Sequence, residues 1–232
     1  MKAPLPEREA ERLRALAAYE LLDTQGEGSY DDITALASYI CECPIALVVL
    51  LDKDRQWFKS KVGLEVSETP REQAFCAHAI LGPNKTLIVP NAELDERFAD
   101  NPLVRGDPRI RFYAGVPLNN PEGHSLGTLC VIDAKPRILT AGQSRALETL
   151  ARQVVGLFEL RRTSLTLARA LENVKTLEGL LPICANCKSI RDEQQNWHSL
   201  EEYLDTRIDV SMTHGICPTC FEKLYPGMKL PD

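Results

Sequence analysis

The chain opens with two segments whose apolar residues recur at helical spacing. Leucine and alanine share one side of a helix over residues 6–22, and apolar residues such as Leu36 and Ile40 do so over residues 30–42. Pro44 follows closely, and proline ends helices because it has no N–H to donate. The pattern predicts two amphipathic helices before the first strand.

Apolar runs after Pro44 have the length and composition of β-strands. The five predicted strands cover residues 45–52, 55–62, 86–90, 110–118 and 125–133. The first pair is joined by a turn at residues 52–54 and the last pair by an Asn-Pro-Gly turn at residues 119–124. Strands in hairpins, with helices grouped before, between and after them, indicate an α+β domain around an antiparallel sheet.

A long helix is predicted from Thr140 to Leu181. Thr140 and Gln143 fit a capping box, in which two side chains satisfy backbone N–H groups at the helix start. From Leu150 onward a heptad register places apolar residues at seven of ten a and d positions, which favours a parallel coiled coil. A single helix that packs one apolar stripe on its own domain is the alternative.

Composition narrows the class of protein. The 232 residues suffice for one sizeable domain and a small one, and 44% hydrophobic with 26% charged residues is typical of a globular chain. A net charge of -6 predicts no nucleic-acid partner. The longest apolar run, residues 45–51, is too short to span a bilayer, and the charged start lacks the apolar stretch of a signal peptide. We therefore expect a cytoplasmic protein without membrane association.

Two cysteine pairs lie near the end of the chain, and they suggest a metal. Four thiolates complete a tetrahedral structural zinc site, and a reducing cytoplasm disfavours disulfides. We expect one structural zinc ion bound by Cys184, Cys187, Cys217 and Cys220, with His214 as an alternative ligand or a supporting residue. A redox pair or free thiols are the alternatives.

Residues from about 20 to 160 resemble a GAF domain, the small-molecule-sensing module of bacterial signalling proteins. The stretches that carry the resemblance are DRQWFKSKVGL, FCAHAI, LIVPNAELDERFADNPLV, IRFYAGVPL and GHSLGTLCVID. The resemblance implies an antiparallel sheet of five or six strands, with the terminal helices on one face as a dimerisation bundle. It also implies a ligand cavity on the other face, closed by residues 72–109. The stretch after Pro182 is similar to a cysteine-rich, zinc-ribbon-like tail of bacterial signalling proteins.

The resemblance leaves the small-molecule ligand unnamed. The candidate ligand-binding residues are Trp57, Phe75, Cys76, His78, Arg109, Phe112 and Tyr113. The aromatic residues are candidates for a cavity wall, with core packing as the alternative. Arg109 is a candidate for holding an anionic ligand, with solvated surface as the alternative.

These features divide the chain into four parts. They are an N-terminal helix at residues 1–22, a GAF core at 23–139, a signalling and dimerisation helix at 140–181, and a zinc-binding tail at 182–232. We expect a homodimer in which ligand binding shifts the dimer helix, while the tail serves as an output or docking surface for a downstream signalling protein. We expect no enzyme, because no complete catalytic constellation is found and no kinase, cyclase or phosphodiesterase domain follows the helix.

Two other functions stay open. One is a GAF enzyme that reduces free methionine sulfoxide, with Cys76 as the nucleophile and His78 lowering its pKa. The other is a ligand-free GAF domain that serves only as a dimerisation scaffold.

Overall fold

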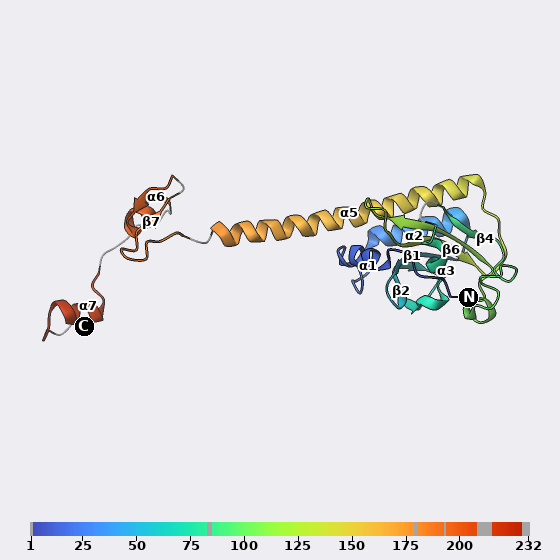
Figure 1. The fold of residues 1–232 in the computed structure, drawn as a ribbon, viewed down its shortest axis with the longest axis horizontal. Helices are drawn as coiled ribbons and strands as arrows, with labels where there is room; N and C mark the ends of the chain where they lie inside the picture. The colour runs from blue at the N-terminus through green and yellow to red at the C-terminus, as the bar shows by residue number, and fades with distance from the viewer. Residues whose placement is uncertain (1, 83–84, 179–180, 193, 208–214, 229–232) are drawn as a thin grey trace. The chain divides into compact units, whose positions relative to one another are not determined.

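A computed structural model describes residues 2–82, 85–178, 181–192, 194–207 and 215–228. The chain divides into two units, Met1–Ala168 and Arg169–Asp232. Figure 1 shows the elements of both units, coloured from the N-terminus to the C-terminus.

The first unit is built on a six-stranded antiparallel sheet with the strand order β3-β2-β1-β6-β5-β4. Its strands are β1 (Ile45–Leu51), β2 (Arg55–Val62), β3 (Glu68–Pro70), β4 (Leu87–Val89), β5 (Phe112–Asn119) and β6 (Ser125–Asp133). Every residue of β1 and β6 is buried, because both strands are central and both faces of the sheet are covered. The predicted α+β class with a five- to six-stranded antiparallel sheet is confirmed.

Helices and short turns complete the first unit. They are α1 (Glu9–Ala17), α2 (Gly28–Cys41), the 3-10 turn η1 (Arg71–Gln73), α3 (Phe75–Ala79), α4 (Pro102–Arg105) and α5 (Ala141–Glu178). Helix α1 ends before the predicted Leu22, because Glu20 has a positive φ of 49° and the chain turns there. The capping box of α5 is confirmed, since Thr140 Oγ1 accepts from the Gln143 backbone N–H at 3.2 Å and Gln143 Oε1 accepts from the Thr140 N–H at 3.0 Å.

One face of the sheet packs against α1, α2 and α5, and Figure 1 shows α2 and α5 on the same side of it. The side chains at its centre are aromatic. The Phe158 ring lies 6.0 Å from that of Tyr19 and 5.8 Å from that of Tyr30, and all three residues are buried. Alternate residues of β1, including Val48 and Leu50, join this helix-side core, as the two-residue period of a strand requires.

A β-bulge in β2 buries an ammonium group on this helix side. The register shifts between Val48 and Val49, opposite Lys59, so that Lys59 and Ser60 both face α2. The Lys59 side chain is 0% exposed, and its Nζ donates to Thr24 Oγ1 (2.8 Å), the Gln25 carbonyl (2.8 Å) and Glu27 Oε1 (2.6 Å). The ammonium therefore has an acceptor for each of its N–H groups, as burial of a charge demands.

Helix α5 changes its surroundings along its length. The heptad residues Leu150 and Leu157 are half-buried against the helix-side core, so this part of α5 packs on its own domain. Leu160, Leu167 and Leu171 are exposed. The apolar stripe is thus shared between the domain and a surface that no described residue of the chain covers.

The second unit contains short elements. They are β7 (Ile190–Arg191), β8 (Trp197–His198), α6 (Leu200–Arg207) and α7 (Pro218–Leu224). The two strands pair antiparallel. Ser199 precedes α6 as its N-cap, and its Oγ accepts from the Glu202 N–H at 3.1 Å. His198 Nε2 lies 2.7 Å from Asp192 Oδ2, and this contact raises the pKa of His198.

Candidate functional site

A cavity of about 520 Å³ lies on the face of the sheet opposite α2 and α5. Its walls come from β1, β2, β5 and β6 and from the covering segment, which we define as residues 63–110. The lining residues are Ile45, Leu47, Gln56, Phe58, Gly63, Leu64, Glu65, Val66, Thr69, Phe75, Leu103, Asp107, Pro108, Ile110, Tyr113, Cys130 and Ile132. The size and the mostly apolar lining are typical of small-molecule sites.

The polar groups in the buried part of the cavity wall are uncharged. Gln56 Oε1 accepts from the Cys76 thiol at 3.0 Å, and Gln56 also donates to Thr69 Oγ1 at 2.5 Å. The Tyr113 hydroxyl lies 3.5 Å from Thr128 Oγ1. Burial raises the pKa of Tyr113 well above its ordinary value and that of Cys130 to about 12, so both groups stay neutral.

Charge occurs at the mouth of the cavity. Glu65 and Asp107 are its two charged lining residues, and both are exposed, whereas the deep wall is buried. Lys61 donates to the backbone carbonyl oxygens of Glu65 and Val66 but does not line the cavity. The lining therefore carries two negative groups and no positive one.

The structure separates the aromatic residues proposed from the sequence. Phe75 and Tyr113 line the cavity, with ring centroids 5.1 Å apart, whereas Trp57 and Phe112 belong to the helix-side core. Phe112 and Tyr113 are neighbours on one strand, so their side chains must point to opposite faces. The expectation that Trp57 and Phe112 lie in the cavity wall is therefore not met.

Cys76 and His78 lie on α3, within the covering segment. Cys76 is buried, and burial raises the pKa of its thiol, so the expectation that His78 lowers this pKa is wrong. The His78 ring packs edge-on against Phe98 at 4.8 Å. Because the thiolate is the reactive form, a neutral buried thiol is poorly suited to attack a sulfoxide.

Arg109 is exposed, has a positive φ of 58°, and lies between the lining residues Pro108 and Ile110 without lining the cavity itself. The guanidinium of the nearby Arg111 pairs with Glu93 at 2.7 Å and donates to backbone carbonyls of the covering segment. The arginines at this strand start therefore order the backbone at the edge of the cavity.

A buried ionic contact connects the covering segment to α1. Glu9 Oε1 accepts from Arg71 at 2.6 Å, and the same carboxylate pairs with Arg12 at 2.8 Å. Burial raises the pKa of Glu9, but the hydrogen bonds and charges of Arg12 and Arg71 outweigh it and lower the pKa to about 2. The contact joins the covering segment at Arg71 to the N-terminal helix.

In the second unit the cysteines stand as two pairs. The side-chain and backbone groups of Ser189 lower the pKa of Cys187 to about 7, and backbone contact with Cys220 lowers the pKa of Cys217. Among the described residues, no three His, Cys, Asp or Glu side chains are close enough to share a metal ion. His214 lies outside the described residues. Each pair is a two-thiol half of the predicted zinc site.

The family model for the GAF domain matches residues 26–158, more than half of the chain. The chain belongs to the GAF family. The region is a sensor domain of the kind found in signalling proteins, and the predicted family is confirmed. Its cavity lies on the sheet face that the resemblance predicted, under the covering segment.

A curated relative is 44% identical to the GAF chain over 162 residues, which is 69% of this chain. It is a cyclic di-GMP phosphodiesterase of Pseudomonas aeruginosa, and the match covers 27% of it, so the chain spans about a quarter of this relative's length. The prediction that the chain is not an enzyme is overturned by this comparison, since a close relative is named as one. No motif in the GAF region itself signalled such a relationship.

One solved structure supports the GAF fold. The GAF domain of a phosphoenolpyruvate-protein phosphotransferase from Acinetobacter aligns with a TM-score of 0.50 and 19% identity, covering 68% of this chain and 97% of that one. A type II free methionine-R-sulfoxide reductase from Thermoplasma acidophilum aligns with a TM-score of 0.45 and 14% identity over 56% of this chain and 92% of its own. The likeness to the first structure supports the fold alone. The likeness to the second is too weak to indicate a shared activity.

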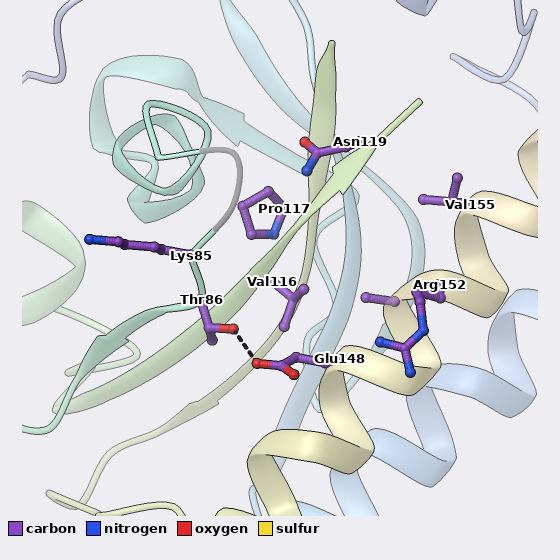
Figure 2. Close-up of a pocket in the computed structure, with 9 residues that line it drawn as sticks. Lys85, Thr86, Val116, Pro117, Asn119, Glu148, Arg152 and Val155 are labelled. Carbon is purple, nitrogen blue, oxygen red and sulfur yellow. Dashed lines mark hydrogen bonds between the residues drawn. The ribbon is translucent and has the colours of Figure 1, made fainter. Parts of the chain in front are cut away.

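A second hollow of about 340 Å³ lies between β5 and α5 of the GAF domain (Figure 2). Lys85 and Arg152 give it positive charge, and Glu148 gives it negative charge. Thr86 Oγ1 donates to Glu148 at 3.2 Å, so this carboxylate already has a partner. The larger and mostly apolar cavity under the covering segment is the stronger candidate for a small molecule.

Sequence reasoning missed the residues that give the GAF cavity its chemistry. Glu65, Val66 and Asp107 stand in polar stretches that resemble ordinary loops, and Gln56 lies beside the misassigned Trp57. Strand alternation would have recovered Gln56, Phe58 and Tyr113 together, given the correct face.

Among the described residues, no helix combines the length and apolar character needed to cross a bilayer.

Proposed function

We propose that residues 1–168 form a GAF sensor whose cavity binds a small molecule, and that its binding state regulates cyclic di-GMP signalling. The observation that carries the first part is the cavity of about 520 Å³ with a mostly apolar wall. The second part rests on the relative of Pseudomonas aeruginosa, which is named for cyclic di-GMP hydrolysis and is 44% identical to this chain.

Ligand binding can reach α1 through the covering segment. Arg71 lies in this segment and is bound to Glu9 of α1. Phe75, which follows η1 by two residues, lines the cavity and contacts Tyr113. A ligand that favours one packing of the segment thereby favours one placement of α1.

The cavity is tested by closing its mouth. Val66 lines the cavity and is 53% exposed, so Val66→Trp blocks the entrance without disturbing the core. The control is Ile138→Trp, at a position 87% exposed and absent from the lining. Native mass spectrometry of the purified chains should show a retained small molecule in wild type and control, and none in Val66→Trp. Equal retention in all three proteins contradicts the proposal, and retention in none favours the scaffold function.

The link to cyclic di-GMP is tested in the native host. A strain lacking the gene should have an altered cyclic di-GMP level, which wild type and Ile138→Trp restore and Val66→Trp does not. An unchanged level in the deletion strain contradicts this part of the proposal.

The proposed assembly is a homodimer joined along the second half of α5. Leu160, Leu167 and Leu171 form an exposed apolar stripe, which a second copy of α5 would cover as a coiled coil. Leu160→Lys with Leu167→Lys should give monomers in sedimentation, because charges are then placed in the seam. Thr166→Lys is the control, since this residue is exposed on the same helix at a c position, away from the seam. A dimer that survives the first pair of substitutions has its interface elsewhere.

The tail is proposed to bind one structural zinc ion through Cys184, Cys187, Cys217 and Cys220. The lowered pKa values of Cys187 and Cys217 support this, because zinc binds the thiolate form. In this proposal the folded tail is the surface that a downstream signalling protein recognises.

Metal content tests the zinc site. Elemental analysis should give one zinc per chain, and a chelator should expose residues 182–232 to protease because metal affinity in such modules is folding free energy on the order of 10 kcal/mol. Cys187→Ser should act like the chelator, whereas Asn186→Ala, between the paired cysteines, should keep the metal. His214→Ala should retain zinc if the four thiolates suffice. A zinc-free tail that resists protease contradicts the site.

A further inference from the structure

We infer that the ligand of the cavity is a molecule with an apolar body and a cationic group, and that the site excludes phosphorylated nucleotides. This inference rests on the proposed function of the same cavity. It separates the molecule that is sensed from cyclic di-GMP, the nucleotide on which the Pseudomonas aeruginosa relative is named to act.

The charged residues that line the cavity are both acidic. They are Glu65 and Asp107, and no ion pair to either is found among the described residues. An anion in the cavity would lie near two carboxylates and lose its hydration without gaining a counter-charge. An ammonium or guanidinium at the mouth would instead gain a partner of opposite charge.

Three cations near the cavity already have other partners. Lys61 donates to the Glu65 and Val66 carbonyl oxygens, Arg111 pairs with Glu93, and Arg71 pairs with Glu9. To obtain a positive partner, a phosphate group would have to break one of these contacts or reach out of the cavity to Arg109, which is exposed and does not line it. The net charge of -6 adds a field of the same sign around the whole chain.

The deep wall defines the other end of the ligand. Leu47, Phe75 and Ile132 give it apolar surface, while Gln56 and Thr69 offer neutral hydrogen-bonding groups that already contact each other. Such a wall suits an aromatic or aliphatic body with at most one neutral polar atom. The apolar body of the ligand would therefore lie in the interior of the cavity, and its cationic group would lie at the mouth.

Three probes of one shape test the assignment. Tryptamine, tryptophol and indole-3-acetate share an indole body and differ in their positive, neutral or negative end. Titration calorimetry at low salt should show tryptamine binding about tenfold more tightly than indole-3-acetate, with tryptophol between them. In the double variant Glu65→Gln, Asp107→Asn, this ratio should fall to within about threefold while tryptophol binding is unchanged.

The outcomes separate this inference from the function on which it rests. Probe binding that persists in Val66→Trp places the probes outside the cavity and counts against the proposed function itself. Binding that Val66→Trp abolishes, but with indole-3-acetate at least as tight as tryptamine, overturns the charge assignment alone. The same holds if cyclic di-GMP displaces bound tryptamine, or if none of the three probes binds.

Discussion

The two faces of the GAF sheet are built from the same strands and serve different ends. The face toward α2 and α5 is filled by large buried side chains such as Tyr19, Tyr30 and Phe158. The opposite face has an apolar cluster of its own but leaves about 520 Å³ unfilled beneath the covering segment. Since a void loses the contacts its walls would otherwise make, the cavity face contributes less stability.

The comparison shows how a small domain combines stability with binding. We expect close packing on one side to supply the larger share of the free energy of unfolding, which allows the other side to hold an open volume. A matched pair of leucines on β1 tests this division most directly, because the strand carries both faces.

The largest expected effect is that of Leu50→Ala, compared with Leu47→Ala. Leu50 is buried in the helix-side core, whereas Leu47 lines the cavity. We expect Leu50→Ala to lower the free energy of unfolding by about 4 kcal/mol and Leu47→Ala by about 2–3 kcal/mol, since fewer contacts are lost beside an existing cavity. Urea denaturation of the ligand-free protein measures both. Equal costs would mean that the two faces are packed alike.

Substitution of glycine sharpens the comparison on β5. A Cβ on Gly115 would lie 2.2 Å from the Tyr113 hydroxyl, so Gly115→Ala must displace a ring of the cavity wall. We expect a loss of about 1–3 kcal/mol in unfolding free energy, together with weaker ligand binding.

Gly156 on α5 is the control for this substitution, because no atom beyond the local helix backbone lies within 4 Å of the place that a Cβ would take. Gly156→Ala should stabilise the protein by about 0.5–1 kcal/mol through helix propensity. Thermal unfolding distinguishes the two variants by the sign of the shift. A Gly115→Ala protein as stable as wild type would show that the Tyr113 ring can move freely.

The smallest effect concerns the contact that joins the two faces. Glu9→Gln removes the carboxylate between Arg12 and Arg71, and we expect a loss of about 1–2 kcal/mol at neutral pH. Because the pKa of Glu9 is lowered to about 2 in the folded protein, its contribution is present above its unfolded pKa near 4.5 and is lost as the pH falls toward 2.

The measurement is the difference in unfolding free energy between wild type and Glu9→Gln from pH 7 to pH 2. It should shrink across the window from about 4.5 to 2, while Glu7→Gln, at an exposed position on the same segment, shows no such window. A constant difference would show that the ionic contact between Glu9 and Arg71 does not stabilise the folded protein.

Much of the sheet could be predicted because its central strands are continuous runs of mostly apolar residues. The run at β1 and the turn before β2 fix a hairpin, and β6 is equally apolar. Strand β3 was missed since Glu68–Pro70 is short and polar, and its pairing with β2 is a tertiary effect. The helix start at Thr140 was predicted correctly because a capping box is a local signal.

The cavity was harder to predict because the candidate residues were drawn from both phases of the alternating pattern, whereas the strand residues that line the cavity share one face. Phe75 and Tyr113 were identified and Trp57 and Phe112 were misplaced, although adjacency on a strand already forbids Phe112 and Tyr113 from sharing a face. Glu65 and Asp107 at the mouth could not be recognised from the sequence, since exposed acidic residues are common on any protein surface.

Lys59 has a practical consequence for following the domain in solution. Its amine is shielded behind Thr24, Gln25 and Glu27, so amine-reactive reagents can reach it only when that loop opens. Exposed lysines such as Lys53 and Lys85 should be acylated at once and serve as an internal reference. The acylation rate at Lys59, measured by peptide mass mapping, then reports how often the loop between α1 and α2 opens.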